Sequence, residues 1–295
     1  MTAPPPPSGA VIVTGSGSGL GASTAVALAE RGYRVVASVH SRDRTAGLDA
    51  LLARSGAAVE VAELDVTDHA AIPAFVAAAA ARHGGLHAVV SNAGVSGVDT
   101  FENEDLASYR RTFEVNVFGP VALLKGSLPH LRAGGGRFVA VSSIAGVLGL
   151  PFQESYSGSK FALEGVLEAF APVARRVGVA VSVVEAGPMS TGAARVADWD
   201  RVLAGAGPYT KVLRRYLDNA IAWRAELPGM PATQTAAEVA AVIADLLGRD
   251  DPPFRCQTAP DTRRLVARKL ADLDGAAAGA VTGGWLDPVP FGTVE

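Results

Sequence analysis

Six short apolar runs alternate with helix-length segments through the first 190 residues of this 295-residue chain. The runs lie at 10–15, 33–39, 57–64, 87–94, 136–143 and 179–187, and the helical segments at 20–31, 43–55, 68–83, 103–132 and 155–177. The runs do not alternate with polar residues, as expected of strands covered on both faces. This order predicts an α/β fold with one doubly wound parallel sheet flanked by helices.

The pattern changes after residue 187. Residues 188–234 carry aromatic and charged residues without a strand signal, and they predict a helical insertion. A helix at 236–248, a strand at 254–259 and a helix at 260–273 are expected next. The Pro-rich residues 1–8 predict a disordered or extended tail, the Gly-rich end 275–295 predicts a loose one, and residues 9–295 form a single domain.

Composition excludes several classes of partner. The net charge is −3 and no Lys/Arg run is present, which argues against nucleic acid. Cys256 is the only cysteine, so no disulfide forms within the chain and a reducing cytoplasm is expected. The start resembles no signal peptide, and no apolar run reaches membrane-spanning length. The five histidines are scattered, and we predict no metal site.

A glycine-rich loop follows the first predicted strand and opens a helix. Its glycines Gly15, Gly19 and Gly21 allow a tight turn and a close approach of backbone N–H groups to a pyrophosphate, which the helix N-terminus also favours. We interpret Gly17 as incidental. The loop predicts a Rossmann-type dinucleotide site, and its cofactor-binding candidates are Gly15, Ser16, Ser18, Gly19, Leu20 and Gly21.

The tip of the second strand carries no acidic residue. A carboxylate about 20 residues after the loop usually binds the adenosine ribose. His40, Ser41 and Arg42 occupy that tip instead, and they are suited to receive a 2′-phosphate. The sequence therefore favours NADP as the cofactor, with NAD possible.

Tyr156 and Lys160 lie four residues apart in a predicted helix, on one face. Lowering the pKa of a phenol from about 10 by about three units costs roughly 4 kcal/mol. A positive charge about 4 Å away supplies a similar energy at an effective dielectric of about 20. The pair is either the polar edge of an amphipathic helix or an acid/base tyrosine whose pKa the lysine lowers. The chain has only four lysines, which favours the second interpretation.

Several motifs occur in an order that resembles the short-chain dehydrogenase/reductase family over residues 10–190. They are TGSGSGLG (14–21), LDV (64–66), SNAG (91–94), EVNVFG around Asn116, VSSIAG (141–146), YSGSK (156–160) and AGPMST (186–191). The family usually has NNAG where this chain has SNAG. Segments 149–165, 185–191 and 269–275 also look like the 17β-hydroxysteroid and retinol dehydrogenase branch, which takes bulky apolar alcohols and ketones.

The resemblance implies a role for each matching residue. Tyr156 is the expected general acid/base, Ser143 binds the substrate oxygen with Ser142 as the adjacent alternative, and Asn116 joins a proton relay to Lys160. Lys160 holds the nicotinamide ribose. The remaining expected cofactor contacts are Asp65 and Val66 at the adenine, Asn92, Ala93 and Gly94 along the cofactor, and Pro188 and Thr191 at the carboxamide.

The expected activity is NAD(P)-dependent interconversion of a ketone and a secondary alcohol on an apolar small molecule. The 188–234 insertion either forms a lid over such a substrate or only packs on the domain or on an oligomer partner. One alternative is a reductase of carrier-bound β-ketoacyl or polyketide intermediates, for which basic residues near the site are needed. Another is a dinucleotide-sensing regulator without turnover. The resemblance also implies a homodimer or homotetramer formed through the helices at 103–132 and 155–177.

Overall fold

The computed structural model describes residues 8–189, 199–222 and 233–271. Its centre is a seven-stranded sheet in the order β3-β2-β1-β4-β5-β6-β7, with every neighbouring pair parallel. The strands are β1 (Ala10–Val13), β2 (Arg34–Val39), β3 (Glu60–Glu63), β4 (Leu86–Ser91), β5 (Arg137–Val141), β6 (Ala180–Glu185) and β7 (Arg255–Gln257). The predicted fold class is confirmed.

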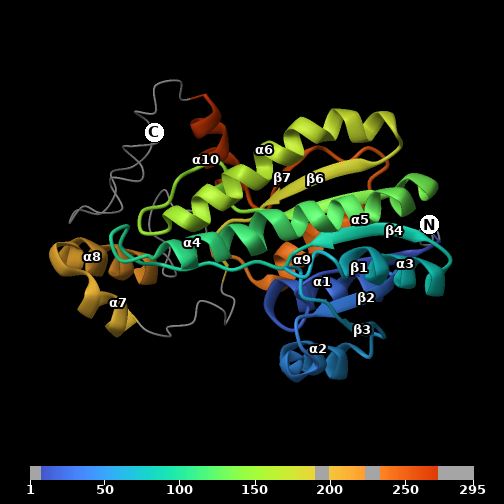
Figure 1. Ribbon diagram of the computed structural model, residues 1–295, viewed down its shortest axis with the longest axis horizontal. Helices are drawn as coiled ribbons and strands as arrows, with labels where there is room; N and C mark the ends of the chain where they lie inside the picture. The colour runs from blue at the N-terminus through green and yellow to red at the C-terminus, as the bar shows by residue number, and fades with distance from the viewer. Residues whose placement is uncertain (1–7, 190–198, 223–232, 272–295) are drawn as a thin grey trace.

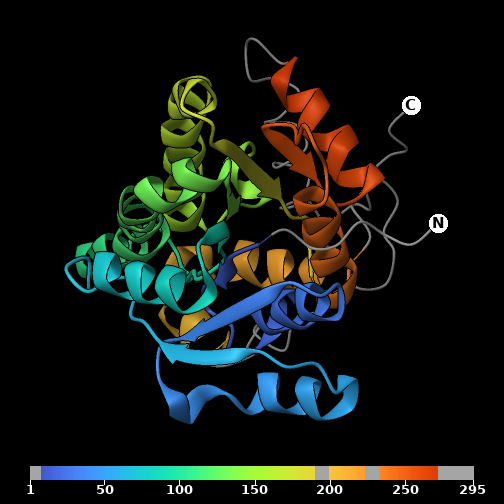
Figure 2. The same ribbon diagram turned by 90° about the vertical axis from the view of Figure 1, so that its right-hand side faces the viewer.

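Helices cover both faces of the sheet (Figures 1 and 2). They are α1 (Gly19–Glu30), α2 (Ala46–Ser55), α3 (Ile72–His83), α4 (Leu106–Phe113), α5 (Gly119–Gly134), α6 (Glu154–Arg176), α7 (Trp199–Gly205), α8 (Thr210–Ala222), α9 (Ala236–Leu247) and α10 (Pro260–Leu270). Short 3-10 turns η1 (Arg42–Arg44), η3 (Ile144–Gly146) and η4 (Gly207–Tyr209) and a π-helical turn η2 (Glu114–Phe118) complete the chain.

Alternate residues of the buried strands supply two separate cores. In β1, Val11 and Val13 pack with the helices α1 and α9, whereas Ala10 and Ile12 pack with α3, α5 and α6 on the opposite face. All four side chains are fully buried. This two-sided burial explains why the strands read as continuous apolar runs.

The strands end earlier than the sequence predicts. β1 ends at Val13 and β4 at Ser91, because the following residues leave the sheet as loops at its carboxyl edge. The predicted helix 103–132 is divided by the π-helical turn η2 into α4 and α5. These differences from the prediction lie at the carboxyl edge of the sheet, which is where ligands bind in doubly wound folds.

The described part of the insertion is helical, as predicted. Helices α7 and α8 pack through a small apolar cluster onto the loop that precedes α6. Leu213 and Tyr216 of α8 are buried in this cluster with Leu148 and Phe152 of the loop. The insertion therefore rests on the segment that leads directly into Tyr156. Segments 190–198 and 223–232, and both predicted tails except residue 8, lie outside the described residues.

Candidate active site

A pocket of about 620 Å³ lies at the carboxyl ends of the central strands. It extends from the glycine-rich loop to the helix α6, where Tyr156 and Lys160 reach it. The predicted site residues that line it are Gly15, Ser18, Gly19, Leu20, Gly21, His40, Asp65, Val66, Asn92, Ala93, Gly94, Tyr156, Lys160 and also Ser142, the alternative to Ser143. Ser143 and Asn116 are not among the residues that line it. One continuous cavity thus unites the glycine-rich loop with the Tyr–Lys pair.

Gly17 is required by the packing of the loop, contrary to our interpretation of it as incidental. A Cβ at this position would overlap the carbonyl oxygen of Arg44, and the Gly17 carbonyl accepts a hydrogen bond of 3.1 Å from the Leu48 amide. The turn η1 and helix α2 therefore press directly on the loop. Sequence spacing did not reveal this contact, because it comes from a segment 27 residues away.

Thr14 joins the glycine-rich loop to the end of β4. Its hydroxyl accepts hydrogen bonds of 3.0 Å from the amides of Asn92 and Ala93. The Asn92 side chain in turn donates to the Thr14 carbonyl at 2.8 Å. Ser16 is fully buried and donates to the Val13 carbonyl at 2.8 Å, so it shapes the loop without facing the pocket.

At the tip of β2 the arginine that lines the pocket is Arg44 and not the predicted Arg42. Neither Ser41 nor Arg42 lines the pocket; His40 and Arg44 do. The Arg42 guanidinium donates to the Val61 carbonyl on the neighbouring strand β3 at 3.3 Å, which turns it away. Arg44, which the sequence analysis missed, is exposed and makes no ion pair with any residue in the described part of the chain.

Asp65 lies at the pocket beside His40. Its carboxylate accepts bonds from the Thr67 amide and hydroxyl at 2.9 and 2.8 Å, and it lies 3.5 Å from His40 Nδ1. The hydrogen bond from the Thr67 amide is the main cause that lowers the pKa of Asp65. The carboxylate is therefore held ionised and oriented by its own loop.

Tyr156 projects from the first turns of α6 toward Ser143. The hydroxyl of Ser143 accepts a 3.1 Å bond from the Ala145 amide. Burial raises the pKa of Tyr156, and the nearby Ser143 hydroxyl opposes that rise. The expected lowering of this pKa by Lys160 is therefore not seen in this arrangement.

Lys160 lies one turn further along α6 and is 5% exposed. Its Nζ donates to the Val141 carbonyl at the end of β5 at 2.9 Å and lies 5.8 Å from the centre of the Tyr156 ring. Burial lowers the pKa of Lys160 to about 8, and the nearby Glu164 carboxylate opposes the change. The ammonium is thus fixed between α6 and the end of β5.

Asn116 lies in the π-helical turn η2 and is fully buried. Its amide nitrogen donates to the Val95 carbonyl at 2.8 Å and to Ser159 Oγ at 3.0 Å, and its oxygen accepts from the Val95 amide at 2.9 Å. A Cβ on Gly94 would be 3.3 Å from Asn116 Oδ1 and 3.8 Å from Lys160 Nζ. The amide therefore braces the pocket wall opposite Lys160.

The segment after β6 is only partly described. The Pro188 carbonyl accepts a 2.9 Å bond from the Gln234 amide, and Met189, rather than Pro188, lines the pocket. Thr191 lies outside the described residues.

Within residues 8–189, 199–222 and 233–271, no group of three His, Cys, Asp or Glu could hold a metal ion. No helix in this part of the chain is long and apolar enough to cross a membrane.

The fold and pocket define a Rossmann-type α/β protein, and comparison with known proteins identifies the family. The family model described as short chain dehydrogenase matches residues 9–201, so the chain belongs to that family. Bovine retinol dehydrogenase 8 is 31% identical over 272 residues, 90% of this chain and 86% of that protein. Mouse 17-beta-hydroxysteroid dehydrogenase type 1 is 33% identical over 67% of this chain and 57% of its own length.

A solved structure supports the assignment across nearly the whole chain. The short-chain dehydrogenase from Streptomyces avermitilis has a TM-score of 0.72 and 27% identity, covering 94% of this chain and 98% of its own. Family membership and the likeness to the retinol and steroid dehydrogenase branch, predicted from the motifs, are confirmed.

The packing at Gly17 yields a direct test of the loop. Gly17→Ala should lower the free energy of unfolding by about 1–3 kcal/mol, because the added methyl group meets backbone rather than a movable side chain. Urea denaturation followed by circular dichroism measures this change. Gly97→Ala is the matched control, since a Cβ there meets nothing within 4 Å. Equal stability of the two variants would contradict the account of this loop.

Proposed function

We propose that the protein is an NADP-dependent oxidoreductase that interconverts a ketone and a secondary alcohol on an apolar small molecule. The observation that carries the proposal is that Tyr156, with Ser143 nearby, lies at one end of a pocket whose other end is the glycine-rich loop. Lys160, on the same helix face as Tyr156, adds a buried cation. A regulator that only binds a dinucleotide needs none of these three side chains.

The pocket residues suit a nicotinamide dinucleotide. At the loop, Ser18 precedes α1 without capping it through its side chain, and the first turn of α1 contains no acidic residue. Backbone N–H groups and the helix dipole are therefore available to a pyrophosphate. Lys160 and Tyr156 would hold the nicotinamide ribose, while Asp65 and Val66 would flank the adenine.

The side chains divide the reaction between them. When bound, NADPH supplies the hydride that reaches the carbonyl carbon. Tyr156 donates its phenol proton to the carbonyl oxygen, and Ser143 holds the same oxygen by a hydrogen bond. The ammonium of Lys160 stabilises the phenolate that remains, and Asn116 connects Lys160 to solvent through a proton relay. The raised pKa of Tyr156 keeps the phenol protonated, which suits the direction of reduction.

The apolar cluster under α7 and α8 supports an apolar substrate. Leu148 and Phe152 belong to the loop that leads into Tyr156, and they pack with Leu213 and Tyr216 of the insertion. Tyr216 accepts a 2.6 Å hydrogen bond from Gln153, which fastens α8 to the same loop. No described residue of α7 or α8 lines the pocket itself, so the support for a lid is that these contacts hold both helices on the loop that leads into Tyr156.

Arg44 and His40 support the preference for NADP. Both line the pocket at the tip of β2, where the 2′-position of the adenosine ribose is expected. Arg44 has a guanidinium without an ion-pair partner among the described residues, so it can bind a phosphate with charge-assisted hydrogen bonds. We therefore assign to Arg44 the role that the sequence suggested for Arg42.

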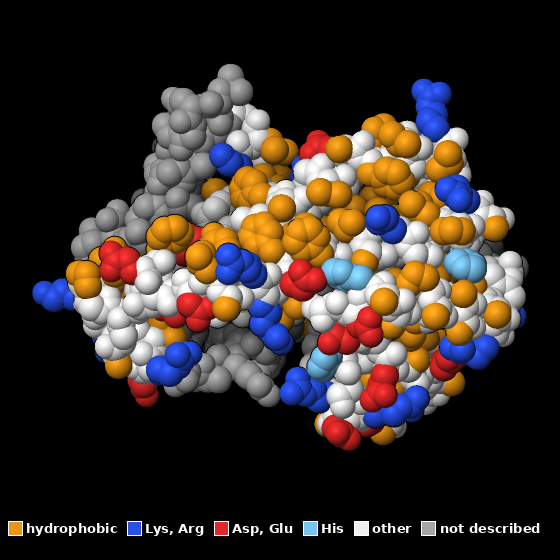
Figure 3. Space-filling view, in the orientation of Figure 1, with side chains coloured by type: hydrophobic (Ala, Val, Ile, Leu, Met, Phe, Trp, Pro, Cys, Tyr) orange, Lys and Arg blue, Asp and Glu red, His pale blue; other side chains and the backbone are white. Residues whose placement is uncertain are grey.

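Exposed apolar side chains along α6 and directly before α5 support a homo-oligomer. Val166 and Val173 of α6 and Val177 directly after it follow one face and are 43%, 56% and 45% exposed, and Phe118 at the end of η2 is 52% exposed. Figure 3 shows hydrophobic side chains gathered over these helices. An exposed apolar face of this kind is suited to a second copy of the chain.

Replacing Tyr156 by Phe tests the chemistry. Tyr156→Phe should reduce kcat for ketone reduction by at least about 100-fold, because the general acid is lost, while NADPH affinity stays near the wild-type value. Steady-state assays with a panel of apolar ketones and NADPH fluorescence titrations measure both. Tyr33→Phe is the control, since Tyr33 stacks on His87 at a ring distance of 5.7 Å and does not line the pocket. Unchanged turnover in Tyr156→Phe would refute the proposal.

Cofactor preference depends on Arg44 in this account. NADPH should bind more tightly than NADH, and Arg44→Gln should weaken NADPH binding by about tenfold while leaving NADH binding nearly unchanged. Arg42→Gln removes the same charge two residues away and should change neither affinity. Separate titrations with NADPH and NADH, followed by nicotinamide fluorescence, decide the matter. A loss of NADPH affinity in Arg42→Gln alone would restore the original assignment.

The oligomer is tested by sedimentation equilibrium. At micromolar concentration the protein should sediment as a multiple of the 30.1 kDa chain. Val173→Asp should shift it toward the monomer, because a charge would be buried at the contact. Val212→Asp, on the exposed side of α8, serves as the matched control and should leave the mass unchanged. A wild-type protein that sediments only as the monomer contradicts this part of the proposal.

A further inference from the structure

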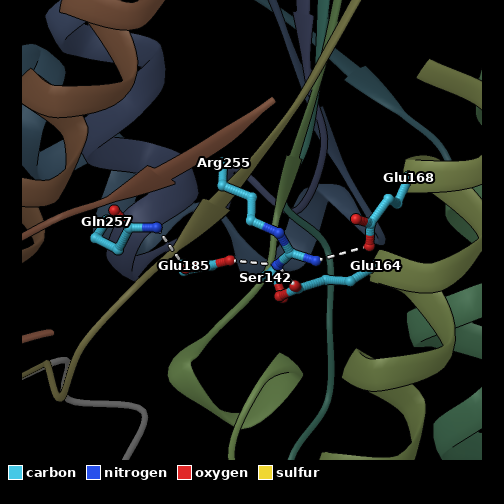
Figure 4. Close-up of polar contacts among 6 residues, drawn as sticks. All are labelled: Ser142, Glu164, Glu168, Glu185, Arg255 and Gln257. Atoms are coloured by element: carbon cyan, nitrogen blue, oxygen red, sulfur yellow. Dashed lines mark hydrogen bonds and ion pairs between the residues drawn. The ribbon is translucent and has the colours of Figure 1, made fainter. Parts of the chain in front are cut away.

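Two buried carboxylates share one arginine directly behind the active site (Figure 4). Arg255 of β7 donates through Nη1 to Glu185 at 2.5 Å and also to Glu164. Gln257 donates to the other oxygen of Glu185 at 2.7 Å, and Ser142 donates to Glu164. We call Ser142, Glu164, Glu185, Arg255 and Gln257 the Arg255 cluster.

The cluster is buried at considerable cost. The side chains of Glu164 and Glu185 are 2% and 0% exposed, whereas that of Arg255 is 21% exposed. Buried ion pairs seldom add net stability over apolar residues of the same size, because removing both charges from water is expensive. Burial raises the pKa of Glu164, and the hydrogen bonds from Ser142 and Arg255 oppose that rise because they favour the charged carboxylate. The contacts that this charge makes therefore indicate what the cluster does.

Glu164 supports the turn that carries Ser143. Its carboxylate accepts the hydrogen bond of Ser142 immediately before Ser143. A Cβ on Gly146 would overlap the same carboxylate and lie 2.6 Å from Ser142 Oγ. Glu164 thus occupies the space beside residue 146 and contacts the turn on both sides of Ser143. It also engages Ser142, which the sequence analysis held as the alternative to Ser143.

Glu164 also lies one helical turn after Lys160 on the same face of α6. Lys160 binds the Val141 carbonyl and Glu164 binds the Ser142 hydroxyl, so two successive turns of α6 hold two successive residues at the end of β5. The register between α6 and the Ser143 turn follows from these two bonds. The negative charge of Glu164 acts on Lys160, whose pKa it raises against the effect of burial.

The opposite side of Arg255 reaches the loop after β6. Glu185 is the last residue of β6, and the next residue, Ala186, accepts a 3.0 Å bond at its carbonyl from the Ile144 amide. Ile144 directly follows Ser143. Arg255 therefore joins the Ser143 turn, the end of β6 and the catalytic helix through one guanidinium.

We propose that Glu164, held by Arg255, is a positioning residue of the active site: it fixes the Ser143 turn against α6 and supplies the negative charge that keeps Lys160 protonated. This inference rests on the proposed function, in which Ser143 and Lys160 act on substrate and cofactor. Among the described residues, the charged or titratable groups that share the pocket with Lys160 are Tyr156, His40, Arg44, Asp65 and Arg111. Glu164 in turn faces Arg255, which also pairs with Glu185.

The direct test is the titration of Lys160 by NMR. The chain has only four lysines, so ¹³Cε-lysine labelling gives a simple spectrum, and Lys160→Arg assigns the signal. Wild-type Lys160 should titrate with a pKa of about 8. Glu164→Gln keeps the shape and a partner for Ser142 but removes the charge, and it should lower the Lys160 midpoint by about one pH unit.

Glu168→Gln is the matched control. Glu168 lies on the same helix and binds the same arginine at 2.9 Å, but its side chain is 60% exposed and it is two turns from Lys160. This substitution should leave the Lys160 midpoint at the wild-type value. An equal midpoint in wild type and Glu164→Gln would overturn the proposal, as would an equal shift in Glu168→Gln.

Activity provides a second measurement that separates the two proposals. The proposed reaction requires a protonated Lys160, so kcat/KM should fall as the pH rises through the pKa of Lys160. In Glu164→Gln this decrease of kcat/KM should occur at lower pH. A simple loss of folded enzyme would lower kcat/KM at every pH without shifting the pH of this decrease. Absence of turnover in the wild type refutes the proposed function, whereas the NMR titration still tests Glu164.

Ser142→Ala tests the positioning of the Ser143 turn without leaving a buried charge unpaired. It should lower kcat about tenfold while NADPH affinity stays within about twofold, because a neutral hydrogen bond that orients Ser143 is lost. This variant also decides the proposal if Glu164→Gln does not fold. Unchanged kcat in Ser142→Ala would contradict the positioning role.

Discussion

The contact between Lys160 and the Val141 carbonyl holds the helix that carries Tyr156 against the strand end that leads to Ser143. It fixes the long helix α6 against the carboxyl end of β5 at a single register. Because Tyr156 lies one turn earlier on the same helix, that register brings its phenol to Ser143, the second residue after Val141. Tyr156, Lys160 and Ser143 therefore meet through one helix and one strand end, and Asn116 of η2 reaches the same helix through its bond to Ser159.

Burial disfavours the charged forms of Tyr156 and Lys160, and a neighbouring side chain counteracts this effect at each of them. The pKa of Tyr156 rises and that of Lys160 falls because both groups lose solvent. Ser143 opposes the first change and Glu164 opposes the second. Glu164 is itself buried, so it needs Arg255, which adds a strand from the far end of the chain to the support of the catalytic helix. A chemical site of a few residues thus depends on packing throughout the sheet.

The sequence predicted features that local chemistry determines and missed those that depend on packing between distant segments. The apolar runs predicted the parallel sheet. The spacing of the glycines predicted one end of the pocket, and the Tyr156–Lys160 interval predicted the other. Arg42 and Arg44 are indistinguishable in the sequence; only the Val61 carbonyl on β3 turns one of them away. The π-helical turn around Asn116 likewise carries no periodic signal, because a single widened turn hardly alters the spacing of apolar residues.

The central claim is that this pocket transfers a hydride from a nicotinamide to a carbonyl carbon. The most direct measurement uses NADPH that carries deuterium at both hydrogens of C4 of the nicotinamide, a panel of apolar ketones, and mass spectrometry of the products. The account predicts an alcohol that carries deuterium on its carbinol carbon, formed as NADPH is oxidised. A protein that binds NADPH tightly, yet forms no deuterated alcohol from any ketone in the panel, would contradict it.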